Sequence, residues 1–88
     1  MIFKRSLHKK RYLNGQLAVF VHNQNGEPLA ELSIKHDSLE LASSEFILKD
    51  YSENKELAQE FIYSKLITPT NRFILIGSHL CPICQIES

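Results

Sequence analysis

The clearest hydrophobic pattern lies in residues 16–35, QLAVFVHNQNGEPLAELSIK. Asn25 and Gly26 favour a two-residue type I′ turn, because both central residues of that turn need positive φ angles. Symmetric pairing about this turn places apolar residues opposite each other on one face: Val21 with Ala30, Val19 with Leu32, and Leu17 with Ile34. The other face pairs Phe20 with Glu31 and is mixed, so the pattern predicts a hairpin with one buried face.

Other stretches predict one helix and several further strands. Residues 53–66 repeat apolar side chains at helical spacing, and the residue before Pro69 disfavours continuation of the helix. Residues 39–41 and 45–50 are predicted as short strands, and 72–77 as a buried strand. A second Asn-Gly, at residues 14 and 15, predicts that the preceding segment is also a strand. Strict pairing there would put Lys10 opposite Val19 on the apolar face, so we expect a bulge or a longer loop.

These elements predict an α+β fold: an antiparallel sheet of four to five strands with one packed helix. We expect a single small domain over residues 1–88, with a basic N-terminal segment (1–12) and a sheet-plus-helix body (13–88). No apolar run reaches the roughly 20 residues that span a bilayer, and the first residues lack the apolar region of a signal peptide. We therefore expect a cytoplasmic protein whose thiols stay reduced.

The formal net charge of zero hides a strong asymmetry. Residues 1–26 contain five basic residues and no acidic one, whereas all ten acidic residues lie from Glu27 onward. The basic stretch FKRSLHKKRY combines cations with aromatic rings, as nucleic-acid-binding surfaces do. The acidic remainder favours the alternative, a solvated edge strand protected by its charges.

Both cysteines lie in the last stretch, SHLCPICQIES. A C-P-x-C turn can direct two thiolates to one centre, as in zinc knuckles, but zinc takes four ligands. His79 shares a face with Cys81 in an extended chain, and His36 is expected on the apolar face of the hairpin. We therefore predict a C-terminal C-P-x-C knuckle and a structural zinc site formed by Cys81, Cys84, His79 and His36.

Two other interpretations of these cysteines stay open. Both cysteines are also compatible with reduced, buried thiols that bind no metal. Each histidine is also compatible with an ordinary surface position. A redox C-x-x-C is less favoured, because its first thiolate is usually stabilised by a helix N-terminus and too few residues follow Cys84 here.

Glu53, Glu56 and Glu60 form an acidic stripe opposite the apolar face of the predicted helix. Such a stripe suits a basic groove on a partner that handles nucleic acid, although an ordinary exposed helix face has the same pattern. The chain has no Gly-rich phosphate loop and no nucleophile elbow, so we expect a protein that is not an enzyme.

Several stretches resemble a family of small proteins of unknown function from phages and integrative elements of low-GC Gram-positive bacteria: LNGQLAVFV, NGEPLAELSI, EFILKDYSEN, LITPTNRFILIG and CPICQI. The resemblance covers about residues 13–86 and is most specific in Gly26-Glu27-Pro28, in the run from Lys49 to Asn54 and in Pro82-Ile83-Cys84.

The resemblance implies an accessory protein of a mobile element, such as an anti-defence factor. Some proteins of that origin resemble type II anti-CRISPR proteins, which bind Cas9 and block guide loading, DNA loading or cleavage, and one group of these inhibitors contains zinc. We therefore expect a stoichiometric Cas9 inhibitor that presents Glu53, Glu56 and Glu60 to its partner. The alternative is a small nucleic-acid-binding accessory or regulatory protein that uses the basic N-terminal segment.

Overall fold

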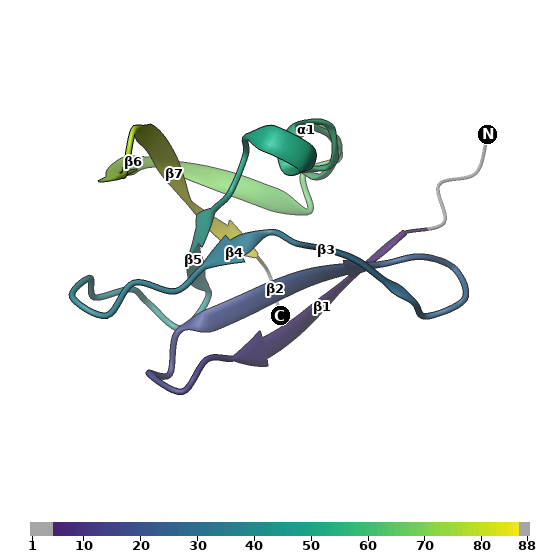
Figure 1. The fold of residues 1–88 in the computed structure, drawn as a ribbon, viewed down its shortest axis with the longest axis horizontal. Coiled ribbons are helices and arrows are strands. Elements are labelled where there is room, and N and C mark those ends of the chain that lie inside the picture. Colours follow the sequence, from purple (N-terminus) through teal and green to yellow (C-terminus); the bar gives the residue numbers. More distant parts are fainter. Residues whose placement is uncertain (1–4, 87–88) are drawn as a thin grey trace.

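The computed structural model describes residues 5–86 and has an α+β architecture (Figure 1). Strands β1 (Ser6–Arg11), β2 (Leu17–His22) and β3 (Pro28–Glu31) form one antiparallel sheet in that order. A second sheet has the order β4-β5-β7-β6 and contains β4 (Ser33–Ile34), β5 (Glu45–Leu48), β6 (Ile67–Ile76) and β7 (His79–Ile86). A 3₁₀ turn (Ser52–Asn54) leads into helix α1 (Lys55–Tyr63). The predicted α+β class with antiparallel strands and one helix is confirmed, but the described residues form two sheets, of three and four strands, in place of one sheet of four to five.

Both Asn-Gly dipeptides lie in hairpin turns that are one residue longer than a type I′ turn. The Tyr12 N–H donates to the Gln16 carbonyl at 2.9 Å, so residues 13–15 form the first loop. The corresponding bond from Asn23 to Glu27 closes a loop of residues 24–26. Each loop ends on a glycine with a positive φ angle, 87° at Gly15 and 83° at Gly26, a conformation that three-residue hairpin loops require. The predicted two-residue turn is therefore wrong, whereas the longer loop expected for the first hairpin is confirmed.

The pairing of β2 with β3 follows the prediction near the middle of the hairpin. Val21 pairs with Ala30 and Phe20 with Glu31, and a register shift between Val21 and His22 absorbs the extra loop residue. The predicted pairing of Leu17 with Ile34 does not form, because Ile34 pairs with β5 instead.

The chain passes from one sheet to the other at Leu32, which lies between β3 and β4. The Leu32 N–H donates to the Val19 carbonyl at 2.8 Å, and the Leu32 carbonyl accepts from the Lys49 N–H at 2.7 Å. The Ser33 hydroxyl accepts the Val19 N–H at 2.8 Å, in a place where a regular ladder would use a backbone carbonyl. One residue thus bonds to both sheets and bends the strand between them.

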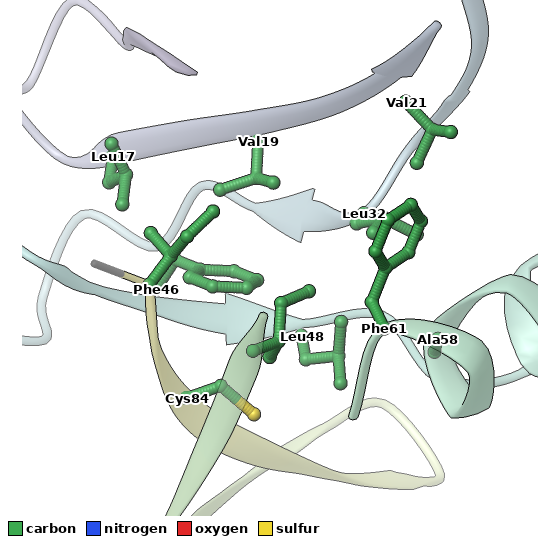
Figure 2. Close-up of a cluster of buried hydrophobic side chains, with 11 residues drawn as sticks. Leu17, Val19, Val21, Leu32, Phe46, Leu48, Ala58, Phe61 and Cys84 are labelled. Atoms are coloured by element: carbon green, nitrogen blue, oxygen red, sulfur yellow. The ribbon is translucent and has the colours of Figure 1, made fainter. Parts of the chain in front are cut away.

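The main core lies between the two sheets and α1 (Figure 2). A smaller cluster lies on the other face of the four-stranded sheet, where the loop between β4 and β5 covers it. The main core contains Leu17, Val19, Val21, Leu32, Phe46, Leu48, Ala58, Phe61, Ile67, Cys84 and Ile86. The smaller one contains Ile47, Cys81 and Ile83, with partly buried neighbours that include Leu39 and Leu41. The predicted strand at residues 39–41 is therefore part of this covering loop.

Strand β6 is the edge of the four-stranded sheet, contrary to the predicted buried strand at residues 72–77. Phe73 is 56% exposed and Leu75 is 65% exposed. Strand β5 pairs with β7 only from Ile83 to Gln85, so residues 79–82 pair with β6 alone. Pro82, which has no N–H, lies just where the pairing with β5 stops. Strands β6 and β7 therefore extend past the sheet as a two-stranded ribbon.

Candidate functional site

Cys81 and Cys84 both lie in β7, and they belong to opposite faces of the four-stranded sheet. Successive side chains of a strand alternate between faces, so residues three apart point in opposite directions. Cys84 belongs to the main core, with which Figure 2 draws it, whereas Cys81 belongs to the smaller cluster. Residues 79–86 form an extended strand rather than a turn, so the predicted C-terminal knuckle is not seen.

The surroundings of both thiols disfavour the thiolate, which is the form that binds zinc. Burial, and secondly the negative charge of Asp50, raise the pKa of Cys81 and raise the pKa of Cys84 to about 12. The Cys81 thiol donates to the His79 carbonyl over 3.7 Å. Buried neutral cysteines of this kind behave as small hydrophobic residues with a weak donor.

The two histidines predicted as ligands contact other residues. The His79 ring stacks on the Tyr51 ring, with 3.7 Å between centroids. His36 lies in the loop after β4, where its Nδ1 is 3.3 Å from the Ser38 hydroxyl. Within residues 5–86, no three His, Cys, Asp or Glu side chains form a group that could hold a metal ion.

The four predicted ligands therefore do not fit a single zinc site in this arrangement. The geometry favours the other interpretation of the cysteines, two buried thiols that contribute to the two hydrophobic clusters. Bound zinc stays a prediction, and metal analysis of the purified protein tests it.

The predicted acidic surface is divided between α1 and the 3₁₀ turn before it. Glu53 lies in that turn, 2.6 Å from the Lys49 ammonium, and this hydrogen bond is the main cause that lowers the pKa of Glu53. Glu60 pairs with Arg5 at 2.9 Å. Glu56 is exposed in the first turn of α1 and forms no ion pair with any residue in the described range 5–86. Neighbouring cations thus pair with two members of the stripe, Glu53 and Glu60, and leave Glu56 without an ion pair among residues 5–86.

An exposed aromatic side chain, which the sequence prediction omitted, extends this surface. Tyr63 is 92% exposed at the end of α1. With Glu56, Gln59, Glu60 and Ser64 it lines a shallow groove along the helix. The sequence contained a signal for Tyr63, because residues 56, 60 and 63 lie on one side of an α-helix.

The basic N-terminal segment forms an edge strand, β1, whose cations lie beside rings of β1 and of its neighbour β2. The His8 ring stacks on the His22 ring at 3.9 Å, and the Lys10 ammonium lies 6.0 Å from the centroid of Phe20. Partial burial first, and then the charges of His8 and Lys10, lower the pKa of His22. Residues 1–4 of the predicted basic segment lie outside the described residues.

Two serine–histidine contacts invite comparison with a catalytic dyad. The Ser6 hydroxyl lies 3.0 Å from His8 Nε2, and the Ser38 hydroxyl contacts His36. A serine nucleophile also needs a group that orients the histidine and donors that stabilise an oxyanion. In both pairs the residues are near neighbours at the surface, and no carboxylate of residues 5–86 hydrogen-bonds to either ring. We assign neither pair a catalytic role.

No family model, curated protein or solved structure matches the chain. The resemblance to small phage and integrative-element proteins therefore stays a prediction. Among residues 5–86, no helix has the length and apolar character needed to cross a membrane.

Proposed function

We propose that the protein is a non-catalytic inhibitor encoded by a mobile element, which acts in the host cytoplasm on a defence nuclease of the Cas9 type. In this proposal α1 docks on a basic surface of the nuclease that would otherwise contact guide RNA or DNA. The observation that carries the proposal is the surface of α1, where Tyr63 is 92% exposed beside Glu56 and Glu60.

The chemistry of this surface suits a protein partner. Tyrosine is enriched among the residues that dominate binding energy, because its ring gives a large contact area at a small cost in conformational entropy. The two carboxylates supply attraction to a basic partner and speed the encounter. Arg5 already pairs with Glu60, so Glu56 and Tyr63 carry most of the proposed contact.

Charge reversal and ring removal on α1 test this proposal. Tyr63→Ala and the double variant Glu56→Lys/Glu60→Lys should each weaken nuclease binding by about tenfold or more, the loss expected for a central contact worth at least about 1.4 kcal/mol. Binding and inhibition of DNA cleavage would be measured with the purified nuclease, and circular dichroism would verify the fold of each variant.

The matched control reverses two exposed acids away from the helix, as Glu27→Lys/Glu40→Lys. This variant changes the net charge equally and should inhibit as the wild type does. Equal losses of inhibition in the two double variants would show a general charge effect. Full inhibition by Tyr63→Ala and also by Glu56→Lys/Glu60→Lys would exclude α1 as the docking surface.

The second candidate function is nucleic-acid binding, which the outer face of β1 and β2 favours. There Lys10 lies over the Phe20 ring and His8 stacks on His22. A phosphate-binding surface loses affinity log-linearly as salt rises, and exposed rings stack on bases. Binding of a single-stranded oligonucleotide that falls steeply with salt and is lost in Phe20→Ala would support this function over nuclease inhibition.

A further inference from the structure

A pocket of 220 Å³ lies beside β1 and shares no lining residue with the groove on α1. Its basic wall is the end of β1, Lys9 to Arg11. The opposite wall is the loop before β5, through Ser43 and Ser44, and its apolar floor is Leu17 and Ile86. The β1–β2 hairpin, the loop before β5 and the end of β7 thus form one small cavity with a basic wall.

Two of the basic residues, Lys9 and Arg11, are exposed but share a face of β1 with a residue that packs against the core. Lys9 pairs with Val19 and Arg11 pairs with Leu17, so both lie on the face of β1 that also carries Leu7. Leu7 packs against the core, but Lys9 and Arg11 line the pocket. Cations that replace apolar residues along the side of a strand that packs on the core are compatible with a functional site. Charges that guard an edge strand are the alternative reason, and such guarding does not need the hydroxyls of the opposite wall.

Ser43 and Ser44 supply neutral donors to the same cavity. Both residues line the cavity, and a serine hydroxyl can donate a hydrogen bond to a ligand. The floor residues Leu17 and Ile86 are buried and offer an apolar contact beside the exposed cations. Cations and hydroxyls around an apolar floor match the donors that bind a tetrahedral oxyanion.

The size and the surroundings of the pocket favour a compact anion over a polymer. Its volume is below the roughly 300–1,000 Å³ typical of pockets for drug-sized ligands. An adjoining depression of 550 Å³ shares Arg11 and Ser43 but is also lined by Asp37 and Glu40. A nucleic-acid strand that continued from the basic pocket in this direction would meet those two carboxylates.

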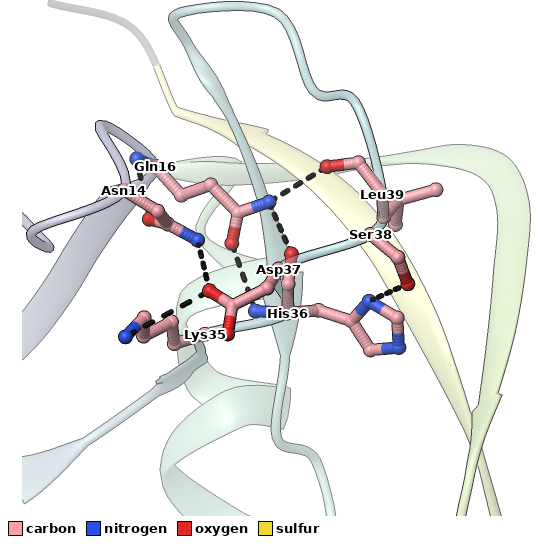
Figure 3. A network of polar contacts seen from close by, with 7 residues as sticks. All are labelled: Asn14, Gln16, Lys35, His36, Asp37, Ser38 and Leu39. Atoms are coloured by element: carbon pink, nitrogen blue, oxygen red, sulfur yellow. Dashed lines mark hydrogen bonds and ion pairs between the residues drawn. The ribbon is translucent and has the colours of Figure 1, made fainter.

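The first part of the loop that carries the serines is held by two side chains, Asn14, which donates to the Asp37 carboxylate at 3.1 Å, and Gln16 (Figure 3). Gln16 donates to the carbonyls of His36 and Leu39, at 2.7 and 2.8 Å, and accepts the His36 N–H at 2.9 Å. Because Gln16 directly precedes Leu17, this amide fixes the loop next to the floor of the pocket. Gln16, just before β2, thus holds residues 36–39 of the loop, and Ser43 and Ser44 at the end of the same loop line the pocket.

We propose that this pocket binds a small phosphorylated molecule, with its phosphate group held by Lys9, Arg11 and the hydroxyls of Ser43 and Ser44. Binding here is independent of partner binding by α1. Inorganic phosphate offers the same chemistry as a phosphomonoester, and the two differ only in the organic group that contacts Leu17 and Ile86.

The test is an NMR titration of the full-length ¹⁵N-labelled protein with inorganic phosphate and with glycerol phosphate, at constant ionic strength set by sodium chloride. Saturable shifts confined to the amides of residues 9–11, 17 and 43–44 support the proposal. Tighter binding of glycerol phosphate supports a phosphomonoester ligand, and equal binding supports free phosphate. Shifts that do not saturate, or that spread over all basic surfaces, would overturn the proposal.

Variants separate a specific site from general attraction to cations. Arg11→Gln should weaken binding about tenfold, as the loss of one charge-assisted hydrogen bond implies, whereas the matched variant Lys55→Gln in α1 should bind as the wild type does. Ser43→Ala/Ser44→Ala leaves the charge unchanged and should weaken binding severalfold, which also keeps the test decisive if Arg11→Gln fails to fold. Equal effects of Lys55→Gln and Arg11→Gln would contradict the proposal. The proposal would also be contradicted if a short oligothymidylate bound more tightly than glycerol phosphate and if its binding did not change in the serine variant.

Discussion

At the scale of single residues, Tyr12 links segments that are distant in the sequence. Its hydroxyl hydrogen-bonds to the Glu31 carboxylate and lies 2.8 Å from the Ser33 hydroxyl, which in turn accepts the Val19 N–H. This chain of bonds supports the backbone where the strand bends from one sheet to the other. Burial, and secondly the hydrogen bond to Glu31, raise the pKa of Tyr12 to about 12.

The raised pKa of Tyr12 predicts a loss of stability in alkaline solution. Tyr12 binds its proton more tightly in the folded protein than in the unfolded chain, where its pKa is 10.0. The stabilisation is therefore fully present below pH 10 and is lost as the pH rises towards about 12. Urea unfolding from pH 8 to 11.5 should show this loss in the wild type and a smaller loss in Tyr12→Phe.

The loss should not vanish in Tyr12→Phe, because burial also raises the pKa of Cys84 to about 12 from 9.0. Tyr63→Phe is the matched control, since Tyr63 is exposed, and its alkaline loss should equal that of the wild type. An alkaline loss in Tyr12→Phe as large as in the wild type would contradict the assigned role of the Tyr12 hydroxyl.

At the scale of elements, local signals predicted the helix and the centre of the second hairpin. The apolar spacing placed the helix at residues 53–66, and α1 occupies Lys55–Tyr63 within it. The bend at Leu32 had no such signal, because alternation continues through it and the strand changes partners only through contacts with distant residues. Pattern alone also cannot tell an edge strand from a buried one when the run is apolar, as in β6.

The candidate site was predictable to a similar degree. The acidic residues of α1 followed from helical spacing, but their ion pairs with Lys49 and Arg5 depend on the tertiary structure. The spacing of Cys81 and Cys84 suits either a turn with converging sulfurs or a strand with diverging ones, and the pairing of β7 with β5 and β6 decides between them. The phosphate pocket combines the β1–β2 hairpin, the loop before β5 and the end of β7, so no single stretch of sequence predicts it.

The loop between β4 and β5 depends on Gln16, which predicts a measurable effect of one substitution. Gln16→Leu removes three hydrogen bonds and leaves the His36 N–H and two carbonyls without this partner. We expect the free energy of unfolding to fall by about 1–3 kcal/mol, the usual cost of losing partners for partly buried polar groups. Urea unfolding measures the loss, and hydrogen exchange at the His36 amide should become faster.

The same substitution at Gln24, an exposed residue in the loop of the second hairpin, is the matched control. Gln24→Leu should leave both the stability and the exchange of His36 unchanged. A stability of Gln16→Leu equal to that of the wild type would show that water replaces the amide without cost and that the loop does not depend on it.

At the scale of the whole molecule, the outer edges of the two sheets differ in their protection against pairing with other chains. The edge strand β1 carries Lys9, Lys10 and Arg11, β3 is short and begins at Pro28, and β4 has only two residues. Charges, proline and short length are the usual means by which edge strands avoid unwanted pairing. Strand β6 has ten residues, and its segment 73–76 is entirely apolar. Among the described strands, β6 is therefore the edge most prone to self-association.

This difference predicts that one charge on β6 will reduce self-association without loss of the fold. Leu75 is 65% exposed and pairs with Leu80, which is 61% exposed, so Leu75→Lys breaks an apolar surface at a small cost in packing. Light scattering of concentrated wild-type protein should rise steeply with concentration, and Leu75→Lys should flatten that rise while the melting temperature stays within a few degrees. Leu66→Lys changes a similarly exposed leucine outside the strands and should scatter as the wild type does. If Leu66→Lys suppressed scattering as strongly as Leu75→Lys, added charge alone would explain the effect and the β6 edge would have no special part in it.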